Sequence, residues 1–209
     1  MFRTKTIILF FVKAIVIYLF LSASFQFYDV FYGNLYSKSN QWIFDRFNHY
    51  GFIKLVPKDK PSLSTFYVGN YTQIKADGKV HCAIYELNTR HFGYLPTILL
   101  ISLILASPVN WKRMLIALFI GIILISGFAI LKQWIYILHI CIEKPWLMLY
   151  EFSESRKHFI EHIFNSYVSP TAPSLVLTVI IWILVTFNIR DLAPKETSMV
   201  KKVPVRKIG

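Results

Sequence analysis

Long apolar stretches constrain the fold of this chain more than any other feature. Ile7–Phe25, Met114–Ile140 and Ser174–Ile189 could each cross a bilayer, and Phe92–Ser107 falls short of the roughly 20 residues that a spanning helix needs. With 55% hydrophobic and only 16% charged residues, the chain is too apolar for an ordinary soluble domain. We therefore predict an all-α membrane protein with four transmembrane helices. Although the first stretch could be a cleaved signal peptide, Lys13 interrupts it, which favours a retained anchor.

These stretches divide the chain into alternating membrane and outer segments. The anchor is followed by an extracytoplasmic segment, a transmembrane helical hairpin, a second extracytoplasmic segment with an interfacial amphipathic helix, a last transmembrane helix and a basic tail. The predicted boundaries are 1–25, 26–91, 92–140, 141–173, 174–190 and 191–209.

Basic residues near the ends of the predicted helices indicate the orientation. Both termini and the turn Pro108–Arg113 are rich in lysine and arginine, whereas the other two loops are nearly balanced in charge. Because basic loops stay in the cytoplasm, we predict both termini inside, in the inner (plasma) membrane. The net charge of +12 then requires no nucleic acid partner. The tail residues expected to contact anionic lipid headgroups are Lys201, Lys202, Arg206 and Lys207.

The first outer segment combines helical and strand patterns. Aromatic residues recur at helical spacing from Phe27 to Phe47 and predict one or two amphipathic helices near the membrane surface. Asp77-Gly78 then separates two runs rich in β-formers, which is typical of a hairpin, and Gly51–Val56 is a candidate third strand. We expect one face of this small sheet to be buried, with Phe66 and Val68 from one run and Val80, Cys82 and Ile84 from the other.

The chain has two cysteines, Cys82 in the hairpin and Cys141 at the end of a predicted transmembrane helix. Both fall on the outer, oxidising side, where a disulfide could tie the hairpin to the helices. Two buried free thiols are the alternative, because the sequence does not give the separation of the Cα atoms.

The second outer segment contains "SRKHFIEH" (155–162), which includes the H-x-x-E-H pattern of inverted zinc proteases. Spacing of four residues places His158 and His162 on one side of a helix, with Glu161 as a candidate base, so a zinc site is one hypothesis. No third ligand follows at motif spacing, and the solvated face of an interfacial helix is the favoured interpretation. A lipid-phosphatase site is excluded because only one of its sequence boxes is present. The apolar face opposite the histidines is predicted to contain Leu149, Phe152, Phe159, Ile160, Ile163, Phe164 and Tyr167.

Two lysines, Lys13 and Lys132, lie within predicted transmembrane helices, where a charge is costly. We expect both to extend toward the nearest interface, with Lys132 reaching the outer one through tilt of its helix.

Two stretches, "FGYLPTILLISLILASPVNWKRMLIALFIGIILI" (92–125) and "SPTAPSLVLTVIIWILVTF" (169–187), resemble small bacterial inner-membrane proteins of the exosortase and archaeosortase neighbourhood, of the exosortase-associated type. The enzymes of that family share a Cys, Arg and His triad at the membrane edge. Here Arg90-His91 occupies the position before the second span without a cysteine, and the third span lacks arginine. The resemblance therefore implies an accessory role rather than transpeptidase activity.

We predict a non-catalytic accessory subunit of a bacterial envelope system, such as protein sorting, polysaccharide export or a larger membrane complex. No complete catalytic set or cofactor motif is present, and the expected partners are the membrane and other membrane protein subunits. The alternative is a membrane-embedded, zinc-dependent hydrolase or an exosortase-like peptidase.

Overall fold

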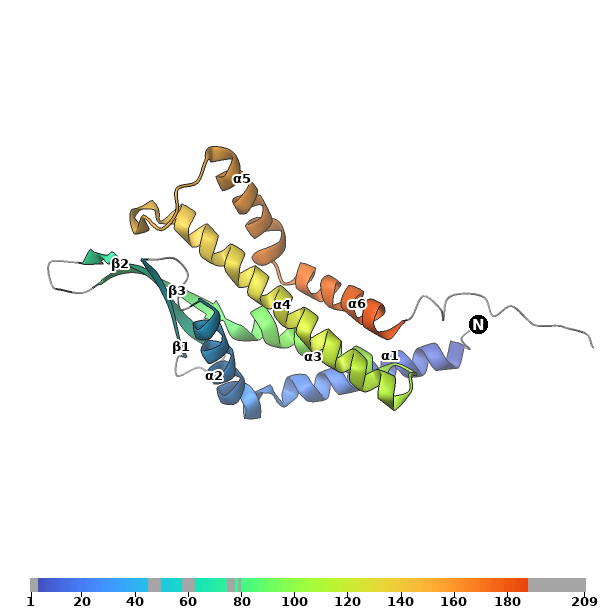
Figure 1. The fold of residues 1–209 in the computed structure, drawn as a ribbon. Helices are drawn as coiled ribbons and strands as arrows, with labels where there is room; N and C mark the ends of the chain where they lie inside the picture. The colour runs from blue at the N-terminus through green and yellow to red at the C-terminus, as the bar shows by residue number, and fades with distance from the viewer. Residues whose placement is uncertain (1–3, 45–49, 58–62, 75–77, 79, 188–209) are drawn as a thin grey trace, which may run out of the picture.

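The structure of the chain is a computed structural model that describes residues 4–44, 50–57, 63–74, 78 and 80–187. It is mostly helical, with long helices leading to a small sheet at one end (Figure 1). In chain order the elements are α1 (Thr4–Ala23), α2 (Phe25–Phe44), β1 (Gly51–Pro57), β2 (Leu63–Ile74), β3 (Val80–Asn88), the π-helix η1 (Arg90–Tyr94), α3 (Leu95–Ala106), α4 (Trp111–Glu143), the 3-10 helix η2 (Pro145–Leu147), α5 (Glu154–Ile163), the π-helix η3 (Phe164–Val168) and α6 (Ala172–Thr186).

Two helices, α1 and α4, are long and apolar enough to cross a membrane. They correspond to the predicted spans Ile7–Phe25 and Met114–Ile140, and most of their apolar side chains face outward. Exposed apolar helix surface of this length is compatible with a lipid environment and costly in water.

The prediction of four transmembrane helices is not supported. The second predicted span corresponds to η1 and α3, which form one helix from Arg90 to Ala106 that would extend about 25 Å, short of the roughly 30 Å hydrocarbon layer. The last predicted span is α6, which has 15 residues and is bent by 72° relative to the helix Glu154–Val168 before it. That bent pair could form one further span, so the described residues provide two spanning helices, or three at most.

Helix α4 is longer than a bilayer requires. Its 33 residues extend about 50 Å, and even a tilt of about 40° would leave about 38 Å along the membrane normal. One end must therefore emerge from the hydrocarbon. At the C-terminal end of α4, Ile137, Ile140 and Cys141 are buried in a core that they share with the sheet. The helix thus links its apolar, lipid-compatible part to the sheet.

The sheet confirms the predicted hairpin and the third strand. Its three strands are antiparallel in the order β1-β2-β3, and Gly78, next to the start of β3, has the positive φ of 75° that a tight turn requires. The predicted buried face of β3 was wrong. Val68 pairs with Ala83, so Ala83 and Leu87 share the buried face with Phe66 and Val68.

Because side chains alternate along a strand, Cys82 and Ile84 point to the opposite side of the sheet. Ile84 is accordingly 61% exposed. Hydrophobicity alone selected the wrong set on β3, since both sets contain apolar residues.

One amphipathic helix, α2, confirms the helical prediction for the start of the first outer segment. Its outward face carries Phe27, Phe31, Leu35 and Trp42, whereas Phe44 is buried against the sheet. Phe47 lies outside the described residues.

The helices α3, α4 and α6 share a second core at the other end of the molecule, formed by Leu100, Ile104, Ala117, Ile125 and Ile181. Trp182 Nε1 on α6 donates a hydrogen bond to Ser107 Oγ at 2.8 Å, and the Phe10 ring of α1 stacks on the indole. The start of α1, the α3–α4 turn and the end of α6 therefore lie at one end, opposite the sheet (Figure 1).

Candidate functional site

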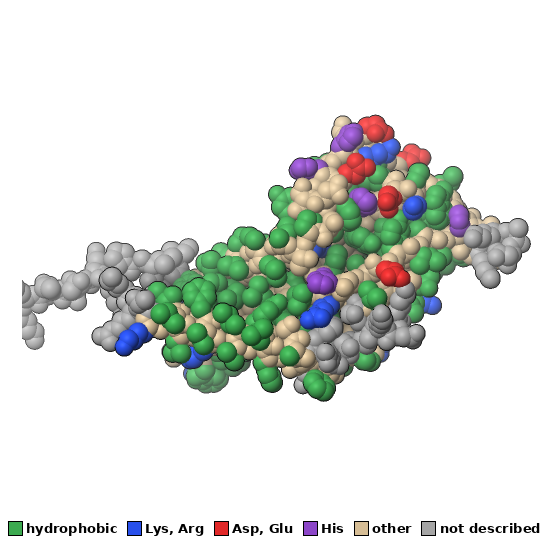
Figure 2. Space-filling view, turned by 180° about the vertical axis from the view of Figure 1, so that it is seen from behind, with side chains coloured by type: hydrophobic (Ala, Val, Ile, Leu, Met, Phe, Trp, Pro, Cys, Tyr) green, Lys and Arg blue, Asp and Glu red, His purple; other side chains and the backbone are tan. Residues whose placement is uncertain are grey.

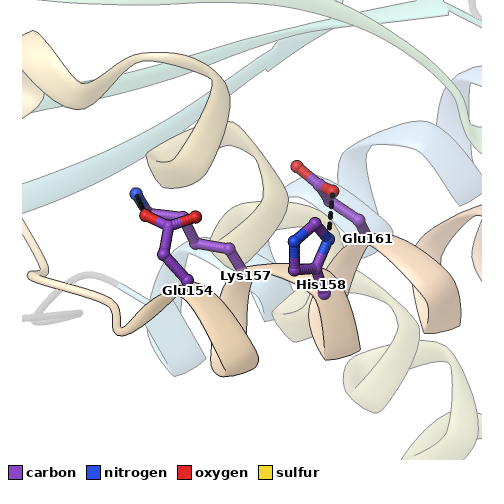
Figure 3. A network of polar contacts seen from close by, with 4 residues as sticks. All are labelled: Glu154, Lys157, His158 and Glu161. Carbon is purple, nitrogen blue, oxygen red and sulfur yellow. Dashed lines mark hydrogen bonds and ion pairs between the residues drawn. The ribbon is translucent and has the colours of Figure 1, made fainter.

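The side chains of the "SRKHFIEH" segment form two local pairs on α5 (Figure 3). Lys157 Nζ lies 2.6 Å from Glu154 Oε1, and His158 Nδ1 lies 3.9 Å from Glu161 Oε2. Each pair joins residues three apart on the same helix, and the His158 side chain is 79% exposed. Such pairs between solvated side chains contribute little to stability and are a common feature of helix surfaces.

Within the described part of the chain, no third ligand lies beside the predicted zinc residues. Among the residues that the structure describes, no group of three or more histidine, cysteine, aspartate or glutamate side chains could hold a metal ion. His158 and His162 both remain exposed. The upstream histidine His139 instead stacks on Phe164 at a centroid distance of 3.8 Å and so joins η3 to α4.

The second outer segment is less helical than predicted. Pro145–Leu147 forms a single 3-10 turn, Met148 has a left-handed φ of 49°, and helix α5 begins only at Glu154. The predicted apolar face is only partly buried, and Phe159 is 64% exposed. Leu147, Leu149 and Val168 anchor this region, each with less than a tenth of its surface exposed.

Both cysteines are free thiols in the structure, and the strand register gives the reason. Cys141 lies in the core on the buried face of the sheet, with Phe66 and Val68. Cys82 is next to the inward-facing Ala83 and therefore points to the opposite face. The sheet itself separates the two thiols.

The side chain of Lys132 lies inside the protein, between α4 and α6. It is buried, with 3% exposure, and its Nζ donates a hydrogen bond to Ser174 Oγ at the start of α6. The Nζ also lies 4.7 Å from the centroid of the Phe92 ring, within the range of a cation–π interaction. The lysine thus connects α4 to α6 and to η1.

The junction between the sheet and the helices is closed by polar contacts on the buried face. Tyr85 Oη on β3 donates a hydrogen bond to Glu143 Oε2 at 2.7 Å, and Asn70 Nδ2 on β2 donates one to the carbonyl oxygen of Leu147 at 2.9 Å. Burial and the bond to Glu143 raise the pKa of Tyr85 above its ordinary value, so this hydroxyl remains a donor at neutral pH. His81 adds a ring stack on Trp146, with centroids 4.0 Å apart.

The opposite face of the sheet carries an apolar surface that we call the outer-face patch, formed by Phe52, Val56, Tyr67, Tyr71 and Ile84. Tyr67 pairs with Ile84 on one side and with Lys54 on the other, so the three side chains form a row across the strands. Tyr71 is 59% exposed, and its ring lies 4.8 Å from that of Phe52.

The helices that contact the sheet do so on its other face. Phe44 of α2, Ile137 of α4 and Leu147 of η2 all join the core with the inward side chains of the strands. Within the described residues, no helix covers the outer-face patch. The exposed members of the patch are Val56, Tyr71 and Ile84, and exposed apolar side chains gathered on one face are typical of protein contact sites.

Charge is distributed unevenly along the molecule. Figure 2 shows hydrophobic side chains covering the helical end, while acidic and histidine side chains gather at the opposite end, around α5. The predicted lipid-contacting residues of the tail, from Lys201 to Lys207, lie outside the described residues.

Comparison with known proteins finds no matching family model, curated protein or solved structure. The sequence motifs offered the α5 residues only as an alternative zinc site, with a solvated helix face as the favoured interpretation. They did not identify the members of the outer-face patch, because these alternate with buried residues that are equally apolar. For Lys132, the signal was visible as a charge inside an apolar stretch, but its partners Ser174 and Phe92 are distant in sequence.

Proposed function

We propose that this chain is a non-catalytic membrane protein that serves as an accessory subunit of a larger membrane complex. The observation that carries the proposal is the outer-face patch, whose members Val56, Tyr71 and Ile84 are exposed on the face of the sheet that no described helix covers. The resemblance of the segments 92–125 and 169–187 to exosortase-associated proteins favours a bacterial envelope system, such as protein sorting or polysaccharide export.

The position of the patch follows from the length of α4. If the hydrocarbon layer begins near Met114, its roughly 30 Å would end near Gln133. Ile137, Ile140 and Cys141, which pack against the sheet, then lie beyond the hydrocarbon. The sheet and its outer face would be in water or headgroups, where an uncovered apolar patch is unfavourable. A partner subunit that covers the patch removes this cost.

The charge distribution supports a cytoplasmic location for both ends of the chain. Lys5, Lys112 and Arg113 lie at the end formed by the start of α1 and the α3–α4 turn, whereas Glu143 and Glu161 lie toward the other end. Basic residues flanking a span favour the cytoplasmic side. In this orientation the basic tail would lie near anionic headgroups of the inner membrane.

Native gel electrophoresis after mild solubilisation of the source membrane tests the subunit role. We expect the wild-type chain to migrate in a complex much larger than its 24.5 kDa mass. The substitution Ile84→Lys places a charge in the patch and should release the chain from the complex. Phe159→Lys is the matched control, because Phe159 is also an exposed apolar residue, 64% exposed against 61% for Ile84. Migration of the wild type as a lone chain would refute the proposal.

The competing hydrolase function predicts bound zinc. Purified protein that contains about one equivalent of zinc, lost on His158→Gln or His162→Gln, would favour that function over the subunit role. We expect both variants to match the wild type in metal content, abundance and complex formation, because the two side chains are exposed.

A further inference from the structure

A buried lysine and an adjacent cavity lie where α4, α6, η1 and η3 meet. The cavity has a volume of about 220 Å³, and Lys132 lies in its wall. The other polar residues of the wall are Glu86, Asn88, His91, Tyr136, Ser169 and Thr171. A molecule of liquid water occupies about 30 Å³, so the cavity has room for roughly seven waters or for a small polar group with some water.

The ammonium of Lys132 is incompletely partnered. It has three N–H donors, and its contacts are the hydroxyl of Ser174 and the face of the Phe92 ring. No carboxylate in the described part of the chain forms an ion pair with it, although Glu86 contributes to the same cavity wall. The Lys132 side chain is only 3% exposed, so the hydroxyl, the ring and whatever fills the cavity must replace the solvation that its charge loses on burial. Among the described residues, no carboxylate pairs with Lys132, and an anion in the cavity would supply that partner.

The surroundings of the ammonium suit an anion. Thr171 is the N-cap of α6 and Ser174 lies in its first turn, at the N-terminal end of a 15-residue helix, which carries a partial positive charge. The hydroxyl groups of Ser169 and Thr171 in the cavity wall can donate hydrogen bonds to oxygen atoms. Together with Lys132 they provide the donors that phosphate and carboxylate groups accept.

The depth of the site agrees with this ligand chemistry. Lys132 is 18 residues beyond Met114, or about 27 Å along the helix axis, close to the outer edge of the hydrocarbon layer. Phe164 and Val168 line the cavity beside the polar residues. A site at this depth is accessible both to the headgroup of a lipid and to an anion from the aqueous side.

We propose that this cavity binds a phosphate or carboxylate group, with Lys132 as its counter-charge. The group is carried by an anionic lipid headgroup or by a free anion. This binding is independent of the outer-face patch and of the subunit role.

Protection of Lys132 from acetylation tests the proposal in the wild-type chain. The full chain is placed in phosphatidylcholine nanodiscs, treated briefly with acetic anhydride and analysed by mass spectrometry. Added inorganic phosphate, or nanodiscs that contain phosphatidylglycerol, should slow acetylation of Lys132 by at least about tenfold, as expected for a hydrogen bond between charged groups. Lys144, at the C-terminal cap of α4 and outside the cavity, is the internal control and should react at the same rate throughout.

The pattern of protection identifies the source of the anion. Protection by phosphatidylglycerol alone assigns a lipid headgroup, and protection by inorganic phosphate alone assigns a free anion. Equal rates of Lys132 acetylation under all conditions overturn the proposal.

A second measurement uses Lys132→Met, which keeps the length of the side chain and removes its charge. The anion that protects Lys132 should raise the thermal unfolding midpoints of the wild-type chain and of the control variant Lys144→Met. It should leave the midpoint of Lys132→Met unchanged. An equal rise in all three proteins would contradict a role for Lys132 as the counter-charge. If Lys132→Met does not fold, the acetylation experiment on the wild type decides alone.

Discussion

Substitutions at neighbouring positions of β3 test how the sheet packs on the membrane helices. Leu87 is 4% exposed and lies in the core shared with Ile137 and Ile140, whereas Ile84 is 61% exposed on the other face. Truncation of a buried leucine to alanine costs about 2–5 kcal/mol, since apolar contacts are lost and a cavity remains. Truncation of an exposed side chain changes stability by about 0.5 kcal/mol or less. We therefore expect Leu87→Ala to be destabilising and Ile84→Ala to be nearly neutral.

Thermal unfolding of the purified protein in detergent, followed by tryptophan fluorescence, measures the difference. Trp134 and Trp146 lie close to this core and should report its loss. For a chain of this size a loss of 1 kcal/mol lowers the midpoint by about 2–4 °C, so Leu87→Ala should unfold at least about 4 °C below Ile84→Ala. An equal or larger loss for Ile84→Ala would refute the strand register and, with it, the position of the outer-face patch.

Three further predictions concern topology, alkaline stability and strand packing. In a background without native cysteines, Lys157→Cys should react with an impermeant thiol reagent in intact cells and Lys112→Cys should not; the opposite pattern would invert the proposed orientation. Burial raises the pKa of Tyr36 above the ordinary 10.0, so the folded state retains a proton that the unfolded state loses. The contribution of Tyr36 to stability should therefore be constant below pH 10 and fall above it. Tyr36→Phe should reduce the slope of that fall in urea titrations, and an unchanged slope would contradict the assignment. A Cβ atom at Gly69 would overlap the Phe52 ring, so Gly69→Val should lower the midpoint of unfolding. Adding Phe52→Ala to that variant should partly restore the midpoint. Additive losses in the double variant would show that the two sites are independent.

Features that depend on local pattern were predictable from the sequence. The apolar runs gave α1 and α4, because a span is defined by length and hydrophobicity alone. Asp77-Gly78 gave the β2–β3 hairpin, since few residues other than glycine adopt the positive φ found at Gly78. The aromatic spacing gave α2 as a helix. Each of these signals lies within a single segment of the chain.

Features that depend on which segments meet were decided by the tertiary structure. The prediction of four spans was not supported at α3 and α6. Hydrophobicity marks a helix as apolar, but it does not distinguish a helix that crosses the bilayer from a shorter one packed within the bundle. The buried face of β3 depends on pairing of Val68 with Ala83, and a shift of one residue exchanges the two faces. The separation of Cys82 from Cys141 follows from the same register.

Lys132 shows the physical limit of the sequence most directly. Its position in an apolar run implies only that the charge is costly there, and extension to an interface is the simplest way to reduce that cost. Ser174 is 42 positions further along the chain, and Phe92 comes from another helix, so no local pattern could place them beside the ammonium. The sequence determined that the charge needs stabilisation, and the packing of α4 against α6 and η1 decided that the lysine stays buried beside a cavity.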